Sequence, residues 1–98
     1  MIRIIYTWKV SSENIELFKT AWSKTTQMIH ETVSGARGSF MLHNVEAEEI
    51  VLTIARWDSY DHWKAFWKAD NPEQMLQMRE LGERISVEVY DEVDDFTK

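Results

Sequence analysis

The chain has 98 residues, of which 44% are hydrophobic and 29% are charged; this is the composition of a folded globular protein and excludes disordered and low-complexity classes. The 17 acidic and 11 basic residues give a formal net charge of −6. We therefore expect no nucleic-acid partner, because such proteins neutralise phosphates with a basic face. The length is that of one domain, assigned here to residues 1–98 with an acidic tail from about residue 91.

Cysteine is absent, which excludes a disulfide framework, a thiolate nucleophile and a cysteine-based metal site. No apolar run approaches the length that spans a membrane, and the N-terminal segment is too polar beyond Tyr6 for a signal peptide. We expect a cytoplasmic protein that has no membrane partner.

The first predicted element is a strand over residues 2–10, which are rich in β-branched and aromatic types. Its even-numbered residues, including Tyr6 and Trp8, share one face, and Ile5 and Thr7 lie on the other. Parity alone leaves open whether Tyr6 and Trp8 face covering helices or a partner chain.

A long helix is predicted next, with Ser11 or Ser12 as its N-cap and Gly35 as the residue that ends it. Apolar and small residues recur there at spacings of three and four, which is the pattern of a helix with one buried face. The stripe consists of Ile15, Phe18, Trp22, Thr26, Ile29 and Val33.

Two further strands are predicted over residues 39–45 and 50–57, joined by the charged segment EAEE. In the second of them, Thr53 and Trp57 share one face, and Arg56 lies on the opposite one. Both faces of this strand are largely apolar, which indicates cover on both sides.

The remaining segments predict two shorter helices and a closing strand. Asp58 or Ser59 caps the first helix, and Asn71 and Pro72 begin the second, which Gly82 ends. The inward-facing stripes are Tyr60, Trp63, Phe66 and Trp67 in the first helix and Met75, Met78 and Leu81 in the second. The closing strand covers residues 84–93.

This element order predicts an α+β protein with the ferredoxin-like split βαβ sandwich and a four-stranded antiparallel sheet. Helices can cover one face of such a sheet, and the other face is still apolar. We expect a second copy to cover it, so that two sheets pack face to face in a homodimeric α+β barrel.

The chain resembles the antibiotic biosynthesis monooxygenase family of dimeric α+β barrels in the segments IYTWKV, LFKTAW, SGARGSF and VLTIARWDSYDHWKAF. The similarity runs from Ile2 to about Val93. It implies a pocket between the helices and the helix-facing side of the sheet. Some members oxidise anthrone-like polyketides with molecular oxygen and without metal or flavin, and relatives with the same fold bind and open haem.

The resemblance also implies site residues. Trp57 stands where the anthrone-oxidising members have a pocket tryptophan, and Arg79 matches their late arginine when a shift of one residue is allowed. Thr53 replaces an asparagine of those members, and Trp63 replaces their tyrosine. The haem-opening pattern fits less well, because the first strand has no asparagine and no histidine follows His62. The tryptophan and histidine positions of that pattern fall at Phe66 and near Leu76.

The residues themselves leave alternatives open. Trp63 and Trp67 lie one helical turn apart and can be either core or pocket wall. Tyr6 is a candidate proton donor, although the usual phenol pKa near 10 limits it as a base. His43 shares a face with the second strand's inward residues, and an imidazole is a side chain suited to proton transfer, but His43 can equally be structural. The histidine spacing predicts no metal site.

We therefore predict a monooxygenase that needs no cofactor and acts on a flat aromatic, quinol-like or anthrone-like small molecule. The alternative is a dimer of the same fold that binds a small ligand without catalysis. The candidate catalytic residues are Tyr6, His43 and Arg79. The candidate substrate-binding residues are Thr53, Trp57, Trp63, Phe66 and Trp67.

Overall fold

A computed structural model describes residues 1–67 and 73–97, and its sheet has four antiparallel strands in the order β2-β3-β1-β4. The strands are β1 (Ile2–Lys9), β2 (Ala36–His43), β3 (Ile50–Trp57) and β4 (Glu83–Asp91). The helices are α1 (Ile15–Thr32), α2 (Tyr60–Trp67) and α3 (Leu76–Leu81), with 3₁₀ turns at Ser12–Asn14 and Glu73–Met75. This order is the ferredoxin-like α+β arrangement, so the predicted fold is confirmed.

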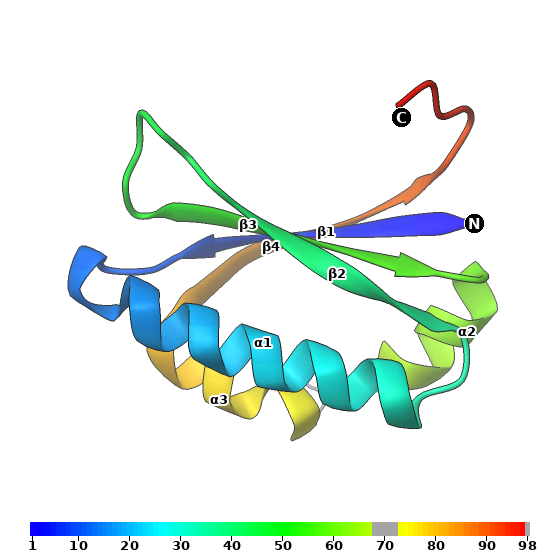
Figure 1. Cartoon of the computed structure of the whole chain (residues 1–98), viewed down its shortest axis with the longest axis horizontal. Helices are drawn as coiled ribbons and strands as arrows, with labels where there is room; N and C mark the ends of the chain where they lie inside the picture. Colours follow the sequence, from blue (N-terminus) through cyan, green and yellow to red (C-terminus); the bar gives the residue numbers. More distant parts are fainter. Residues whose placement is uncertain (68–72, 98) are drawn as a thin grey trace.

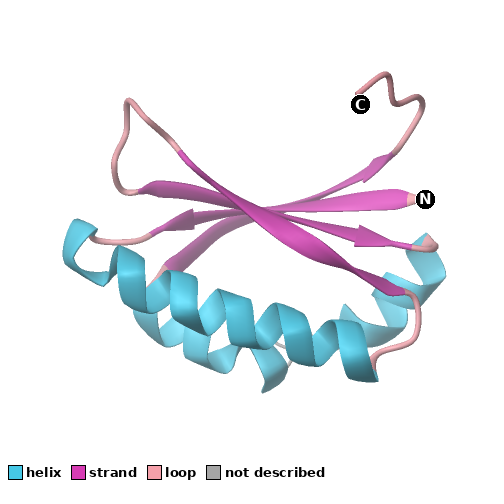
Figure 2. Cartoon of the chain, viewed as in Figure 1, coloured by secondary structure: helices cyan, strands magenta, loops and turns pink. Residues whose placement is uncertain are grey.

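The helices lie against one face of the sheet, and the opposite face carries no helix in the described part of the chain (Figures 1 and 2). The even-numbered residues of β1 are buried, with Tyr6 4% and Trp8 0% exposed. Arg3, Ile5 and Thr7 on the other face are partly exposed. The face that parity left open is thus assigned: Tyr6 and Trp8 point toward the helices.

The link between α1 and β2 differs from the prediction. The helix ends at Thr32 with Val33 as an extended cap, so Gly35 lies in the following turn rather than directly after the cap. Gly35 has φ +88°, and a Cβ there would lie 2.5 Å from Cγ of His62. Glycine is needed at this position because of both the left-handed backbone and the close approach of the His62 ring.

Strand β2 begins at Ala36, three residues earlier than predicted, and contains a bulge near its start. Ala36 pairs with Trp57 and Ser39 pairs with Ala55, so three steps along β2 match two steps along β3. Gly38, with φ +95°, lies inside this irregularity. The sequence pattern missed the start of the strand because a bulge interrupts the alternation of side chains.

Of the two predicted helix starts that lie within the described residues, one has the predicted cap. At α2, the backbone N–H of His62 donates to Oγ of Ser59 over 3.2 Å, which selects Ser59 as the cap. At the start of α1, Ser11 makes no side-chain cap hydrogen bond, and the 3₁₀ turn precedes the helix instead. The predicted caps Asn71 and Pro72 lie outside the described residues.

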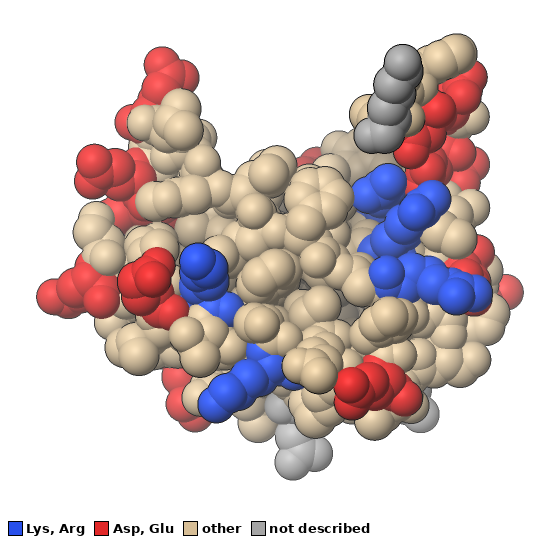
Figure 3. All heavy atoms as spheres, viewed as in Figure 1, with Lys and Arg blue, Asp and Glu red and all other residues tan. Residues whose placement is uncertain are grey.

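The helix-free face of the sheet is bordered by two projections, the β2–β3 loop and the C-terminal segment, and Figure 3 shows acidic side chains on both. The Glu92 carboxylate accepts a hydrogen bond from Nε of Arg3 over 3.1 Å and another from an Arg56 guanidinium nitrogen over 3.3 Å.

Several apolar and aromatic side chains on the helix-free face remain exposed, including Phe40 at 44%, Leu42 at 47% and Tyr90 at 50%.

Candidate functional site

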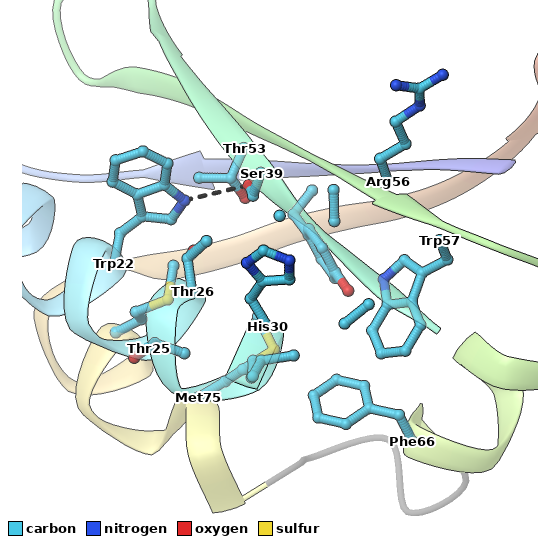
Figure 4. Close-up of a pocket in the computed structure, with 16 residues that line it drawn as sticks. Trp22, Thr25, Thr26, His30, Ser39, Thr53, Arg56, Trp57, Phe66 and Met75 are labelled. Carbon is cyan, nitrogen blue, oxygen red and sulfur yellow. Dashed lines mark hydrogen bonds between the residues drawn. The ribbon is translucent and has the colours of Figure 1, made fainter. Parts of the chain in front are cut away.

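A small cavity lies between the sheet and the helices, beside the end of β3, and has a volume of about 40 Å³ (Figure 4). Side chains from β1, β2 and β3 form one side of it. Residues of α1, α2 and α3 and the 3₁₀ turn before α3 form the other side. The cavity therefore occupies the layer in which the resemblance to the monooxygenase family places a pocket.

Two hydroxyl groups form the floor of the cavity. Tyr6 and Thr53 are direct partners in the β1–β3 register, and both line it. The Tyr6 hydroxyl accepts from Nε1 of Trp63 over 3.2 Å, and Oγ1 of Thr53 accepts from Nε1 of Trp8 over 3.0 Å. Because each oxygen accepts from a buried indole, each hydroxyl keeps its own hydrogen to donate.

Burial determines the proton chemistry of Tyr6. Its removal from water raises the pKa of the phenol to about 12, while the hydrogen bond from Trp63 and the charge of Arg84 act in the opposite direction. The phenol is therefore neutral at physiological pH. Tyr6 can donate a hydrogen bond to a ligand, but it cannot act as a base there.

Trp57 and Phe66 form an aromatic wall of the cavity. Their ring centroids are 5.3 Å apart at an interplanar angle of 35°. Trp57 is 2% exposed and Phe66 is half-buried. In Figure 4 the indole nitrogen of Trp57 faces the cavity, and it makes no hydrogen bond to another described residue. Its N–H is therefore available to a ligand.

The wall formed by α1 was not predicted from the sequence. Trp22, Thr26 and His30 line the cavity from successive turns of the helix, and Nε1 of Trp22 donates to Oγ of Ser39 over 3.2 Å. Their spacing of i, i+4 and i+8 is the signal that could have identified this wall. The sequence pattern placed Trp22 and Thr26 in the buried stripe, which does not include His30.

Trp63 and Trp67 belong to a closed aromatic layer and do not line the cavity. Their rings are stacked, with centroids 5.5 Å apart at 19°, and the Tyr6 ring lies 5.5 Å from Trp67. The Arg84 guanidinium lies 4.8 Å from the Trp67 ring centroid. Trp63 reaches the cavity only through its hydrogen bond to Tyr6.

Two of the candidate catalytic residues lie elsewhere. His43 is exposed at the end of β2, where Nε2 donates to the Glu48 carbonyl of the β2–β3 loop. Arg79 is exposed on α3, whose residue Met78 faces the cavity. Of the eight candidate residues, the cavity brings together Tyr6, Thr53, Trp57 and Phe66.

No permanently charged group of the described lining residues points into the cavity. Arg56 is the one lining residue with a permanent charge among those described, and Figure 4 shows its side chain pointing away from the cavity. Its guanidinium binds Glu92 instead. Within residues 1–67 and 73–97, no three His, Asp or Glu side chains gather where they could hold a metal ion.

The sequence model of the antibiotic biosynthesis monooxygenase family matches residues 1–78, most of this chain. The chain belongs to this family. A solved Bordetella bronchiseptica protein assigned to the antibiotic biosynthesis monooxygenases superposes with a TM-score of 0.80 at 19% identity, over 94% of this chain and 96% of that one.

Two other solved structures resemble this family member over nearly its whole length. A cofactor-independent oxygenase from Streptomyces nogalater has a TM-score of 0.73 at 12% identity, over 99% of this chain and 97% of that one. A haem-degrader from Mycobacterium tuberculosis, solved with two haems in its active site, has a TM-score of 0.76 at 18% identity, over 99% and 100%. At these identities the likeness shows the shared fold.

A search of curated proteins found no match. No helix in the described ranges has both the length and the apolar character that crossing a membrane requires.

Proposed function

We propose that this protein is a monooxygenase that uses no cofactor and oxidises a flat, electron-rich aromatic molecule bound in the cavity beside Trp57. The observation that carries the proposal is the Trp57 indole N–H, which faces the cavity without a partner among the described residues. Buried indoles usually find a hydrogen-bond partner, so a free one in a cavity wall favours a ligand that supplies the acceptor.

The reaction requires that the substrate is desolvated and oriented and that a nearby group accepts its proton. An anthrone-like substrate loses a proton from the carbon between its rings and becomes a carbanion. The carbanion gives electrons to dioxygen and forms a carbon–oxygen bond, and after protonation a hydroperoxide results. Loss of water from the hydroperoxide leaves a quinone oxygen on that carbon, so one dioxygen yields one new carbonyl oxygen and one water.

The cavity is small for such a substrate. Its volume of about 40 Å³ holds roughly three water molecules, and pockets for drug-sized ligands have roughly 300–1,000 Å³. We propose that Phe66, which is half-buried at the aromatic wall, moves when a ligand enters. The floor formed by Tyr6 and Thr53 stays fixed because both hydroxyls accept hydrogen bonds from buried indoles.

The proposal is tested with the purified protein and a panel of anthrones and hydroquinones. Quenching of tryptophan fluorescence measures binding, and an oxygen electrode measures turnover. We expect both signals with 1,8-dihydroxyanthrone. The control ligand is naphthalene, which is flat but has no acidic proton and should bind without oxygen uptake. Quenching without turnover across the panel would support the non-catalytic alternative, and absence of quenching would reject a site for this class of ligand.

We also propose a homodimer that packs through the helix-free face of the sheet. Phe40, Leu42 and Tyr90 are between 44% and 50% exposed on this face, and covering them with a second copy would remove apolar surface from water. The expected result is a dimer in sedimentation at micromolar concentration. Sedimentation as a monomer under these conditions would reject this assembly.

A further inference from the structure

The three histidines of the chain differ in what holds their rings. His43 donates from Nε2 to the Glu48 carbonyl, and His62 shares a 2.6 Å hydrogen bond between its Nδ1 and Oγ of Ser59. The His30 ring makes no hydrogen bond to any other described residue and lines the cavity. His30 is thus the histidine that is both free and turned toward the cavity.

The position of His30 suits contact with a flat ligand. Figure 4 shows the imidazole between Trp22 on one side and Trp57 and Phe66 on the other. His30 is exposed, whereas Thr53 on the floor is 2% exposed. A ligand that lay on the floor and against the aromatic wall would therefore have one edge at the His30 ring.

The other described groups that line the cavity cannot take a proton from such a ligand. Burial raises the pKa of Tyr6 to about 12, which keeps the phenol protonated. The Arg56 guanidinium points to the opposite face and binds Glu92. The threonine and serine hydroxyls have no basic character near neutral pH. An imidazole does, and it is the side chain suited to proton transfer in this range.

We infer that His30 is the catalytic base, and that the substrate enters uncharged and carries an acidic proton that His30 removes. This inference rests on the proposed oxygenase function and deepens it. A lone pair of the imidazole takes the proton, the electron pair of the broken bond stays on the substrate, and an imidazolium–carbanion pair results. Among the described lining side chains, this imidazolium is the positive charge that faces the anion. Within the described residues, no fixed cation faces this position to pair with a carboxylate or phosphate, so we expect substrates without those groups.

The experiment separates proton removal from oxidation. Under nitrogen, 1,8-dihydroxyanthrone is added to the wild type, to His30→Gln and to the control His43→Gln. Tryptophan quenching reports binding, and the visible absorption band of the anthrone anion reports deprotonation. We expect all three proteins to quench, and the anion band to appear with the wild type and His43→Gln and to be lost with His30→Gln. After air is admitted, kcat for oxygen uptake should be roughly 100-fold lower in His30→Gln, the order expected for loss of a general base.

The outcomes are distinguishable. An anion band of equal strength in His30→Gln, or quenching by the wild type with no anion band, overturns the role of His30 and leaves the binding site standing. No quenching by the wild type overturns the proposed function and this inference together. Far-UV circular dichroism of each variant checks the fold, and His30 is exposed, so its replacement by glutamine leaves the core unchanged.

Discussion

Helix α2 carries two neighbouring aromatic residues with different surroundings. Phe66 packs against Trp57 at the cavity wall, whereas Trp67 stacks on Trp63 and packs against the Tyr6 ring in a closed layer. The indole N–H of Trp63 is hydrogen-bonded to Tyr6, and that of Trp57 is free within the described structure. Aromatic density in a sequence therefore does not separate core from binding wall. For Trp57 and Trp63 the hydrogen-bond state of the indole agrees with this division, whereas Trp22 lines the cavity and still donates to Ser39.

The largest expected effect is the loss of stability when a ring is removed from the closed aromatic layer. Trp67→Ala removes a 6% exposed indole and should lower the free energy of unfolding by about 3–5 kcal/mol. The matched variant Phe66→Ala, at the half-buried cavity wall, should cost about 1–2 kcal/mol. Urea denaturation at one protein concentration measures both. Equal losses would show that the two aromatic groups do not differ in packing.

The next effect is a dependence of the protein's stability on pH through Tyr6. The pKa of Tyr6 is raised from 10.0 to about 12 in the folded protein. Keeping this phenol neutral stabilises the folded protein fully below pH 10. The stabilisation is lost as the pH rises from 10 towards 12, because in this range the phenol of the unfolded chain ionises while that of the folded protein stays protonated. The pKa difference between the folded and the unfolded phenol corresponds to about 2–3 kcal/mol in the free energy of unfolding.

Urea denaturation of the wild type and Tyr6→Phe at a series of pH values checks this. We expect the wild type to lose stability above pH 10 more steeply than Tyr6→Phe. Tyr60→Phe, which removes an exposed phenol, should follow the wild type. Parallel curves for the wild type and Tyr6→Phe would contradict a closed layer around Tyr6.

The smallest effect is on ligand binding. Trp57→Ala should weaken binding of 1,8-dihydroxyanthrone by about tenfold, or about 1.4 kcal/mol, because it removes one stacking wall and one N–H donor. Trp67→Phe keeps a ring in the closed layer and should bind within about twofold of the wild type. Titration by the absorbance of the ligand avoids the change in tryptophan content. A weaker complex with Trp67→Phe than with Trp57→Ala would reverse the assignment of wall and core.

Most of the fold followed from the sequence because periodicity records which face of an element is buried. The strand alternation placed Thr53 and Trp57 on one face, and the structure has both on the helix side. Parity also placed His43 on that face. Parity gives no position along the strand, however, and His43 pairs with Val51 near the loop, whereas the cavity lies toward Trp57.

The rest of the site depends on features that periodicity does not contain. His30 is exposed, and a stripe of buried residues therefore does not include it. Arg79 follows the buried Met78 on α3, where a step of one residue turns the side chain away from the cavity. Trp63 and Trp67 have the helical spacing of a wall, and only the tertiary packing of Tyr6 and Arg84 around them makes them core.

The bulge in β2 has a consequence for how the length of this strand can vary. Ala36 and Ser39 are an odd number of positions apart, and the irregularity at Gly38 allows both to line the cavity. Loss of Gly38 would leave them two positions apart, and a regular strand would direct both to the same side. Deletion of one residue here would then shorten this part of the cavity wall while preserving the inward pattern. Thermal unfolding of a Gly38 deletion variant, set against deletion of Phe40, would reveal that tolerance.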